Sequence, residues 1–356
     1  MSAHVSRPGI VEALAAAALF GASTPLAKLL VGSVSPVMLA GLLYLGSGIG
    51  LLAWFLLRRL RTGRTAHEAV LTRRDVPWLA GAILAGGVVG PVLLMLGLTH
   101  TPAASASLLL NLEGVFTAAL AWFVFRENFD RRIALGMAAI VAGGVLLSWP
   151  GETGGTSLWA LAIAGACLAW AIDNNLTRKI AAGDPVQIAG LKGLVAGLIN
   201  TGIALALGHA FPGVATVLAA GIVGVLGYGI SLALFVLALR HLGSARTGAY
   251  FSTAPFIGAA LSFVLLRETP GPLFWGAAGL MAAGVWLHLT ERHAHQHAHV
   301  PLAHDHAHVH DEHHRHEHNF PWDGHAPHAH FHEHVPLVHS HPHYPDIHHR
   351  HRHGRG

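Results

Sequence analysis

The sequence is short of charge and almost free of cysteine. Charged residues make up 11% of the chain, whereas soluble globular proteins average about 25%. The single cysteine, Cys167, excludes a disulfide framework and a Cys-x-x-Cys metal site. No nucleotide-binding motif or catalytic-triad spacing is present, so we expect no enzyme activity, no ATP-driven pumping and no required cofactor. The low charge and the lack of enzyme motifs, together with a hydrophobic content of 53%, favour a membrane protein over a soluble enzyme.

Long apolar runs are what the sequence has in abundance. A membrane-spanning helix needs about 20 apolar residues. Runs of roughly that length occur ten times, at Ile10–Val31, Pro36–Leu57, Trp78–Thr99, Ser105–Phe125, Ile133–Trp149, Leu158–Ile180, Pro185–Leu207, Val214–Leu239, Ala245–Leu266 and Leu273–Leu289. We therefore predict an all-α integral membrane protein with ten transmembrane helices. The first run also resembles a cleavable signal peptide, but its alignment with the sixth run favours a retained helix.

The apolar part of the chain is duplicated. The segment His100–Glu127 aligns without a gap on His241–Glu268, and Lys28 falls on Arg178. Internal duplication in an apolar chain is typical of membrane transporters. We divide the chain into a short N-terminus (1–9), a first five-helix repeat (10–149), a second five-helix repeat (158–290) and a tail (291–356).

The distribution of Lys and Arg predicts the orientation in the membrane. With a cytoplasmic N-terminus, fourteen basic residues fall in inside loops and about two near the outside. The inside set is Arg7, Arg58, Arg59, Arg61, Arg64, Arg73, Arg74, Arg126, Arg131, Arg132, Arg178, Lys179, Arg240 and Arg246. Five spans are an odd number, so the second repeat enters from the opposite side and the repeats are inverted. We expect an inner-membrane protein with both termini in the cytoplasm.

The pattern resembles the EamA family of the drug/metabolite transporter superfamily. The resemblance rests on the two five-helix repeats, on Glu127 and Glu268 just beyond the fourth and ninth helices, and on the Gly-rich helix that follows each. It implies a secondary transporter with a substrate path lined by the first, third, fourth, sixth, eighth and ninth helices. The chain departs from the family where Glu113-Gly114 replaces the Ala254-Pro255 of the second repeat, so we expect a carboxylate in place of a kink in the fourth helix.

Apart from Arg178, Lys179 and Arg246, which belong to the inside set above, five charged residues fall within the apolar runs. A charge at membrane depth costs about 2.5–3.5 kcal/mol on insertion scales. Glu12 and Lys28 lie near helix ends, where long side chains reach the interface. Glu113, Asp173 and Lys192 lie deeper. Asp173 and Lys192 are at similar depth on consecutive helices, so they pair either as a structural ion pair or as part of a substrate or proton site. Glu113 has no obvious cation at its depth, which favours a functional role.

Neutral polar residues on the same helices extend the list of candidates. Each is more often a helix-contact residue than a ligand contact, but all lie on helices that the resemblance assigns to the path. The complete set of substrate-path candidates is Glu113, Asp173, Asn174, Lys192, Asn111, Tyr228, Tyr250 and Ser252.

The tail differs in composition from the rest of the chain. It holds 24 of the 30 histidines and few apolar residues, so we expect it to be disordered. Imidazole is a good ligand for Ni, Cu and Zn, so we expect weak binding of divalent metal (Ni, Zn or Co) at several places. The candidate ligands are His293, His295, His297, His299, His304, His306, His308, His310, His313, His314, His316 and His318.

Three functions remain open. The first is a secondary transporter, an exporter or permease of a small metabolite, with the tail as an accessory. The second is a divalent-metal transporter, and the third is a membrane-anchored metal buffer. The apolar runs lack a dense group of His, Asp, Glu and Cys residues, which favours the first. The expected partners are a small-molecule substrate, the lipid bilayer and divalent metal ions, and no nucleic acid.

Overall fold

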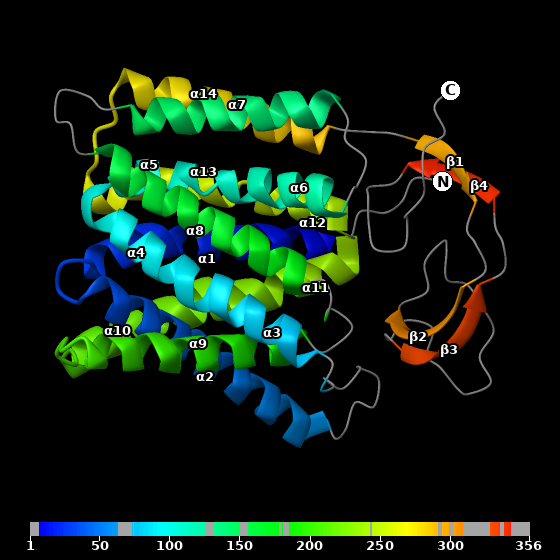
Figure 1. Cartoon of the computed structure of the whole chain (residues 1–356), viewed down its shortest axis with the longest axis horizontal. Helices are drawn as coiled ribbons and strands as arrows, with labels where there is room; N and C mark the ends of the chain where they lie inside the picture. Colours follow the sequence, from blue (N-terminus) through cyan, green and yellow to red (C-terminus); the bar gives the residue numbers. More distant parts are fainter. Residues whose placement is uncertain are drawn as a thin grey trace.

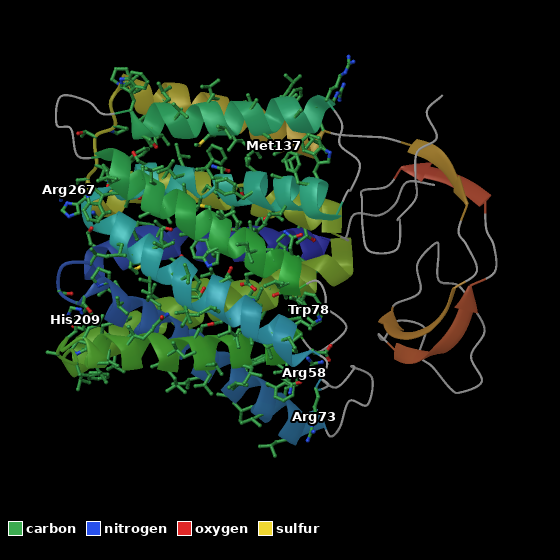
Figure 2. All side chains as sticks on the ribbon, viewed as in Figure 1. Arg58, Arg73, Trp78, Met137, His209 and Arg267 are labelled. Carbon is green, nitrogen blue, oxygen red and sulfur yellow. The ribbon has the colours of Figure 1, made fainter. Side chains whose placement is uncertain are left out.

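A computed structural model describes most of the chain. The described residues are 7–62, 73, 75–125, 131–149, 156–177, 180, 185–242, 244–290 and four tail segments, 294–298, 302–308, 328–334 and 338–342. Figure 1 shows a bundle of long helices lying side by side. Figure 2 places Arg58, Arg73 and Trp78 at one end of this bundle and Arg267 and His209 at the other. We call these the Arg58 end and the Arg267 end.

Both repeats contain the same series of helices. The first repeat consists of α1 (Arg7–Leu30), α2 (Pro36–Thr62), α3 (Val76–Ala82), η1 (Ile83–Val89), α4 (Gly90–His100), α5 (Ala103–Leu109), α6 (Leu112–Phe125) and α7 (Arg131–Ser148). The second consists of α8 (Thr156–Thr177), α9 (Pro185–Ala206), α10 (Val214–Gly224), η3 (Val225–Ile230), α11 (Ser231–Leu242), α12 (Ser244–Phe251), α13 (Ala254–Leu266) and α14 (Pro272–Leu289). Each predicted apolar run is therefore helical over most of the residues that the structure describes.

Among the described residues, seven helical stretches are long and apolar enough to cross a membrane. The sixth, ninth and tenth predicted runs are not among them. The ninth is divided between α12 and α13, and the apolar part of α14 is short, Pro272–Leu287. The count of ten spans stays a prediction. Large apolar side chains cover the outside of the bundle, such as Phe123 at 70% exposure and Trp286 at 61%, and lipid is the solvent that suits such a surface.

The two repeats meet in matched contacts between α2 and α9. A Cβ added to Gly48 would lie 2.2 Å from the backbone nitrogen of Leu194, and one added to Gly197 would lie 2.5 Å from that of Leu45. Gly48 and Leu45 hold the same places in the first repeat as Gly197 and Leu194 hold in the second. A second set of contacts is matched in the same way. α1 of the first repeat packs on α11 and α13 of the second, and α8 of the second repeat packs on α4 and α6 of the first. Small residues allow this close backbone approach in a membrane bundle.

The fourth helix is broken although it has no proline, which corrects the expectation of a carboxylate in place of a kink. α5 ends at Leu109 and α6 begins at Leu112. At the break, the backbone N–H of Asn111 and its side-chain amide both donate to the carbonyl of Leu108, at 3.1 and 2.9 Å. A side chain that takes a backbone acceptor competes with the helical ladder. The fourth helix thus has a break as well as the carboxylate of Glu113.

The third helix of each repeat contains a π-helical segment. These are η1 in the first repeat and η3 in the second, each continuous with the α-helices on both sides of it. A π-helical turn widens the helix and leaves backbone carbonyls open to side chains from neighbouring helices. Such segments are frequent at functional sites. η1 and η3 hold matching positions in the two repeats, so the middle of the bundle is a candidate place for a functional site.

Four strands lie in the tail, where disorder was expected throughout. They are β1 (Ala294–Ala298), β2 (Leu302–His308), β3 (His328–His334) and β4 (Val338–Pro342). β1 pairs with β4 and β2 with β3, both antiparallel (Figure 1). Histidines that alternate with other residues have the period of a strand, which explains how such a composition forms paired strands.

Candidate functional site

Asp173 and Lys192 form the ion pair that their similar depth predicts. Asp173 Oδ1 lies 2.5 Å from Lys192 Nζ, and the hydroxyl of Thr177 donates to the same oxygen at 2.8 Å. Lys192 also donates to the Thr177 oxygen at 3.1 Å. The other carboxylate oxygen of Asp173 packs on Gly86 of η1, where an added Cβ would lie only 1.9 Å from it. Three helical elements, α8, α9 and η1, therefore hold this pair.

Glu113 lies on α6 beside the same stretch of α8. Its Oε1 accepts a hydrogen bond from Asn174 Nδ2 at 2.8 Å. Glu113 is half-buried and Asn174 is exposed. Within the described helices, the carboxylate of Glu113 has no ion-pair partner. The polar site thus combines an ion pair, Asp173 with Lys192, and the carboxyl group of Glu113, which has no counter-ion within the described helices.

The π-helical segment η1 is fixed by side chains that the sequence patterns did not single out. The hydroxyl of Tyr44 and the indole N–H of Trp170 both donate to the carbonyl of Gly86, each at 2.9 Å. Asn200 donates to the carbonyl of Gly87 at 3.0 Å. These donors come from α2, α8 and α9, so three helices meet at η1. The Gly86-Gly87 pair was the one signal in the sequence, because glycine permits such close approach.

A chain of aromatic rings joins this site to η3, α1, α12 and α11. Tyr44 contacts Tyr228 of η3 with ring centroids 5.6 Å apart, and Tyr228 contacts Phe20 of α1 at 6.0 Å. Phe20 continues to Phe251 at 5.4 Å, and Phe251 to Phe235 at 4.8 Å. Tyr228, a predicted candidate, therefore lies beside Tyr44, which donates to the carbonyl of Gly86 in η1. These rings supply an apolar and polarisable wall.

The other predicted path residues are placed differently. Asn111 is buried, and its amide contacts the carbonyl of Leu108 and the sulfur of Met281 on α14, so it serves the helix break. Tyr250 lies in α12, which packs against α1 and α11, and Ser252 follows it at the break before α13. The structure thus brings together Glu113, Asp173, Asn174, Lys192 and Tyr228.

Five of the predicted metal ligands fall on strands. His295 and His297 lie in β1, and His304, His306 and His308 lie in β2. The others lie outside the described residues, namely His293, His299, His310, His313, His314, His316 and His318. Within the described helices, no three His, Cys, Asp or Glu residues come together as a metal site requires.

Comparison with known proteins agrees with this architecture. A solved protein structure matches with a TM-score of 0.57 and 19% identity over 80% of this chain and 98% of its own, which shows the shared fold. A protein described as an uncharacterized transporter from Methanothermobacter thermautotrophicus is 31% identical over 78% of this chain and 85% of its own length.

Two further relatives carry more specific names. A probable terminal-alkyne amino-acid exporter from Streptantibioticus cattleyicolor is 26% identical over 60% of this chain and 73% of its own. A probable amino-acid metabolite efflux pump from Salmonella typhimurium is 28% identical over 53% of this chain and 68% of its own. The profile of the EamA-like transporter family matches twice, at residues 7–149 and 157–290. The chain is therefore an integral membrane protein that belongs to the EamA-like transporter family.

Proposed function

We propose that this transporter exports a small metabolite with a protonated amine, of the amino-acid class, by secondary transport. The observation that carries the proposal is the carboxylate of Glu113, which is held by Asn174 beside an already neutralised Asp173–Lys192 pair. When Glu113 is ionised, the three side chains carry one net negative charge. A carboxylate at membrane depth without a counter-ion favours a ligand of opposite sign.

The rest of the site suits the remainder of such a substrate. Tyr44, Tyr228 and Phe20 offer ring faces and edges to an apolar side chain, and a cation near a ring face gains further stabilisation. The names of two relatives, an amino-acid exporter and an amino-acid metabolite efflux pump, agree with this class. Without an ATP motif, the driving force is an ion gradient or the gradient of the substrate itself.

The proposed orientation puts the Arg58 end in the cytoplasm. It rests on the fourteen basic residues in inside loops against about two outside, and it places both termini in the cytoplasm of a bacterial-type inner membrane. The proposed functional units are the two repeats, 10–149 and 158–290. An exporter in this orientation loads substrate from the Arg58 end and releases it at the Arg267 end.

Counterflow in proteoliposomes tests the proposal. Vesicles that contain the purified protein are preloaded with unlabelled amino acids, organic amines or dicarboxylic acids, and uptake of labelled compound is followed. We expect counterflow for compounds with a protonated amine and none for dicarboxylic acids. Equal counterflow of dicarboxylic acids would overturn the assignment of Glu113 as the charge-selecting group.

The tail has a separate proposed role as a weak, multi-site binder of Ni, Zn or Co. The register of β2 and β3 supports it, because His304 lies opposite His332, His306 opposite His330 and His308 opposite His328. Directly opposite residues of an antiparallel pair have Cβ atoms about 4.5–5.5 Å apart. In β1 and β4, His295 lies opposite His341 and His297 opposite His339.

This register keeps a second function open, in which the protein transports divalent metal or buffers it at the membrane. The paired histidines of β2 and β3 favour it. The described helices favour metabolite transport instead, because a metal path through them would need ligand groups of the kind that transition metals prefer. The tail then collects or reports metal without supplying the transported substrate.

A further inference from the structure

Two hydrogen-bond donors and one acceptor of the polar site have no partner among the described residues. The ammonium of Lys192 has three N–H donors, and its acceptors are two, Asp173 Oδ1 and the oxygen of Thr177. The side-chain amide of Asn174 has two N–H donors, of which one is given to Glu113 Oε1. One donor of Lys192, one donor of Asn174 and Oε2 of Glu113 are therefore open to a ligand.

Consecutive residues of α8 hold these open groups close together. Asp173 binds the ammonium of Lys192, and Asn174 binds the carboxyl group of Glu113. The Cα atoms of consecutive residues are about 3.8 Å apart. The carboxyl groups of Asp173 and Glu113 are also both near enough to the hydroxyl of Tyr44 to interact with it electrostatically. The open donors and the open acceptor therefore belong to one site on the scale of a small ligand.

Asn174 is exposed although it lies on the inner face of α8. Leu168 and Ile172 mark the outer face of this helix, at 41% and 38% exposure. With about 100° of turn per residue, Asn174 is rotated about 200° from Ile172. It falls in line with Cys167 and Trp170, which are both buried. The open donor of Asn174 is therefore accessible to a ligand from within the bundle.

The first repeat builds the matching junction without charges. In the aligned repeats, Ser23 of α1 holds the place of Asp173, and Leu43 of α2 holds the place of Lys192. The close contact with the π-helical segment is kept, because a Cβ added to Gly227 of η3 would lie 2.5 Å from the Cβ of Ser23. The helix packing at this junction therefore needs no ion pair, and the presence of the pair in one repeat indicates a role beyond packing.

We propose that Lys192 and Asn174 bind the carboxylate of the substrate while Glu113 binds its amine. The inference rests on the proposed function and narrows the substrate class from amines to zwitterionic α-amino acids. The substrate ammonium donates to Glu113 Oε2, and the substrate carboxylate accepts from the two open donors, so each open group gains a partner. A site that hydrogen-bonds a substrate group discriminates against analogues that lack it, because its own polar groups are then left unpaired. Simple amines, which keep only the Glu113 contact, are therefore weaker substrates.

Counterflow of matched compounds in proteoliposomes tests this inference. L-Phenylalanine and L-leucine are each compared with the amine that lacks only the carboxylate, phenethylamine and 3-methylbutylamine. The apparent KM of the amino acid should be roughly tenfold lower than that of its amine, the scale of one charge-assisted hydrogen bond. Equal KM values within each pair would overturn the inference and leave the proposed transport of amines intact. Absence of counterflow for all of these compounds would overturn the proposed function, and the inference with it.

Variants assign the carboxylate contact to particular residues. Asp173→Asn combined with Lys192→Met removes the ammonium donor and leaves no uncompensated charge behind. This double variant should raise the KM of the amino acid roughly tenfold, to that of its amine. Asn174→Ala removes the other donor at an exposed position, so it keeps the test decisive if the double variant fails to fold. It should also reduce the ratio of the two KM values.

Lys28→Gln is the matched control, since Lys28 is the other lysine within the apolar runs. Its ammonium donates to the backbone carbonyls of Leu98 and Thr101, not to a carboxylate. The ratio of the KM values of amine and amino acid should therefore stay at its wild-type value. A ratio that survives both the double variant and Asn174→Ala would overturn the inference, as would an equal fall in Lys28→Gln.

Discussion

Asp173 of α8 and Lys192 of α9 are joined by an ion pair in which the oxygen and nitrogen atoms are 2.5 Å apart. The two side chains are only 12% and 16% exposed, respectively. Removal of one partner leaves a charge that the surroundings solvate poorly, and this costs about 3–5 kcal/mol in buried pairs. The packing of α8 against α9 therefore depends on both charges being present together.

The first prediction concerns the balance of this pair. Asp173→Asn or Lys192→Gln alone should lower the melting temperature of the purified protein in detergent, because each leaves one uncompensated charge. The double variant should recover most of the loss, because it leaves none. Thermal unfolding of the three variants measures this. A double variant as unstable as the sum of both single changes would show that the charge balance is not what stabilises the contact.

The second prediction concerns Glu113 in transport. Glu113→Gln keeps the size of the side chain and an oxygen acceptor for Asn174 but removes the charge that selects an amine or carries a proton. We expect the transport rate to fall at least about tenfold, equivalent to about 1.4 kcal/mol, while the protein still inserts in the membrane. Glu12→Gln, the same change near the end of α1, should retain most activity. Wild-type rates for Glu113→Gln across a range of pH would refute the role.

The third prediction concerns the contact between Gly86 and Asp173. In Gly86→Ala the new Cβ would lie 1.9 Å from the carboxylate, so Asp173 or η1 must move. Overpacking of this kind costs about 1–3 kcal/mol, and transport should fall as well because the Lys192 pair is displaced. Gly202→Ala is the matched control, since a Cβ there meets no atom within 4 Å. Equal melting temperatures for the two variants would contradict the predicted clash.

The Asp173–Lys192 pair was predictable because the rise per residue of a helix sets the depth of each side chain, and two opposite charges at one depth attract. The roles of Tyr44, Trp170 and Asn200 were not predictable, because these side chains donate to backbone carbonyls of η1. No periodic pattern in the sequence indicates a π-helical turn, which the packing of several helices stabilises. The break in the fourth helix was missed for a related reason. Proline was taken as the breaking residue, whereas Asn111 takes the carbonyl of Leu108 instead.

The composition of the tail predicts its disorder but not its paired strands. Few apolar residues and frequent prolines predict disorder, since such a chain cannot bury a core. Strand pairing needs only alternating residues and backbone hydrogen bonds, and the pairs β1–β4 and β2–β3 have both. Which residues lie opposite each other was not predictable, because a partner strand such as β3 lies far along the chain from β2.

The fourth prediction concerns metal binding by the tail. Deletion of 291–356 should leave a membrane domain that still inserts, because each helix satisfies its own backbone hydrogen bonds, and should remove most Ni or Zn binding. In the intact protein, binding should fall as the pH drops below about 6, because histidine with an ordinary pKa near 6.5 becomes protonated and no longer ligates metal. Calorimetry on both proteins at two pH values measures the stoichiometry. If deletion leaves the stoichiometry unchanged, the metal site lies in the membrane domain and metal transport becomes the favoured function.

A finer comparison tests the strand register. Replacement of His304, His306 and His308 by alanine removes one side of the cross-strand pairs with β3 and should weaken Zn binding more than an equal change at three other tail histidines. Replacement of His313, His314 and His316 is that matched control, since it removes the same number of imidazoles. Histidines that act as independent ligands would give equal losses for the two triple variants. A larger loss from the β2 variant means that opposite histidines bind one ion together, because each lost imidazole then also leaves its partner with fewer ligands.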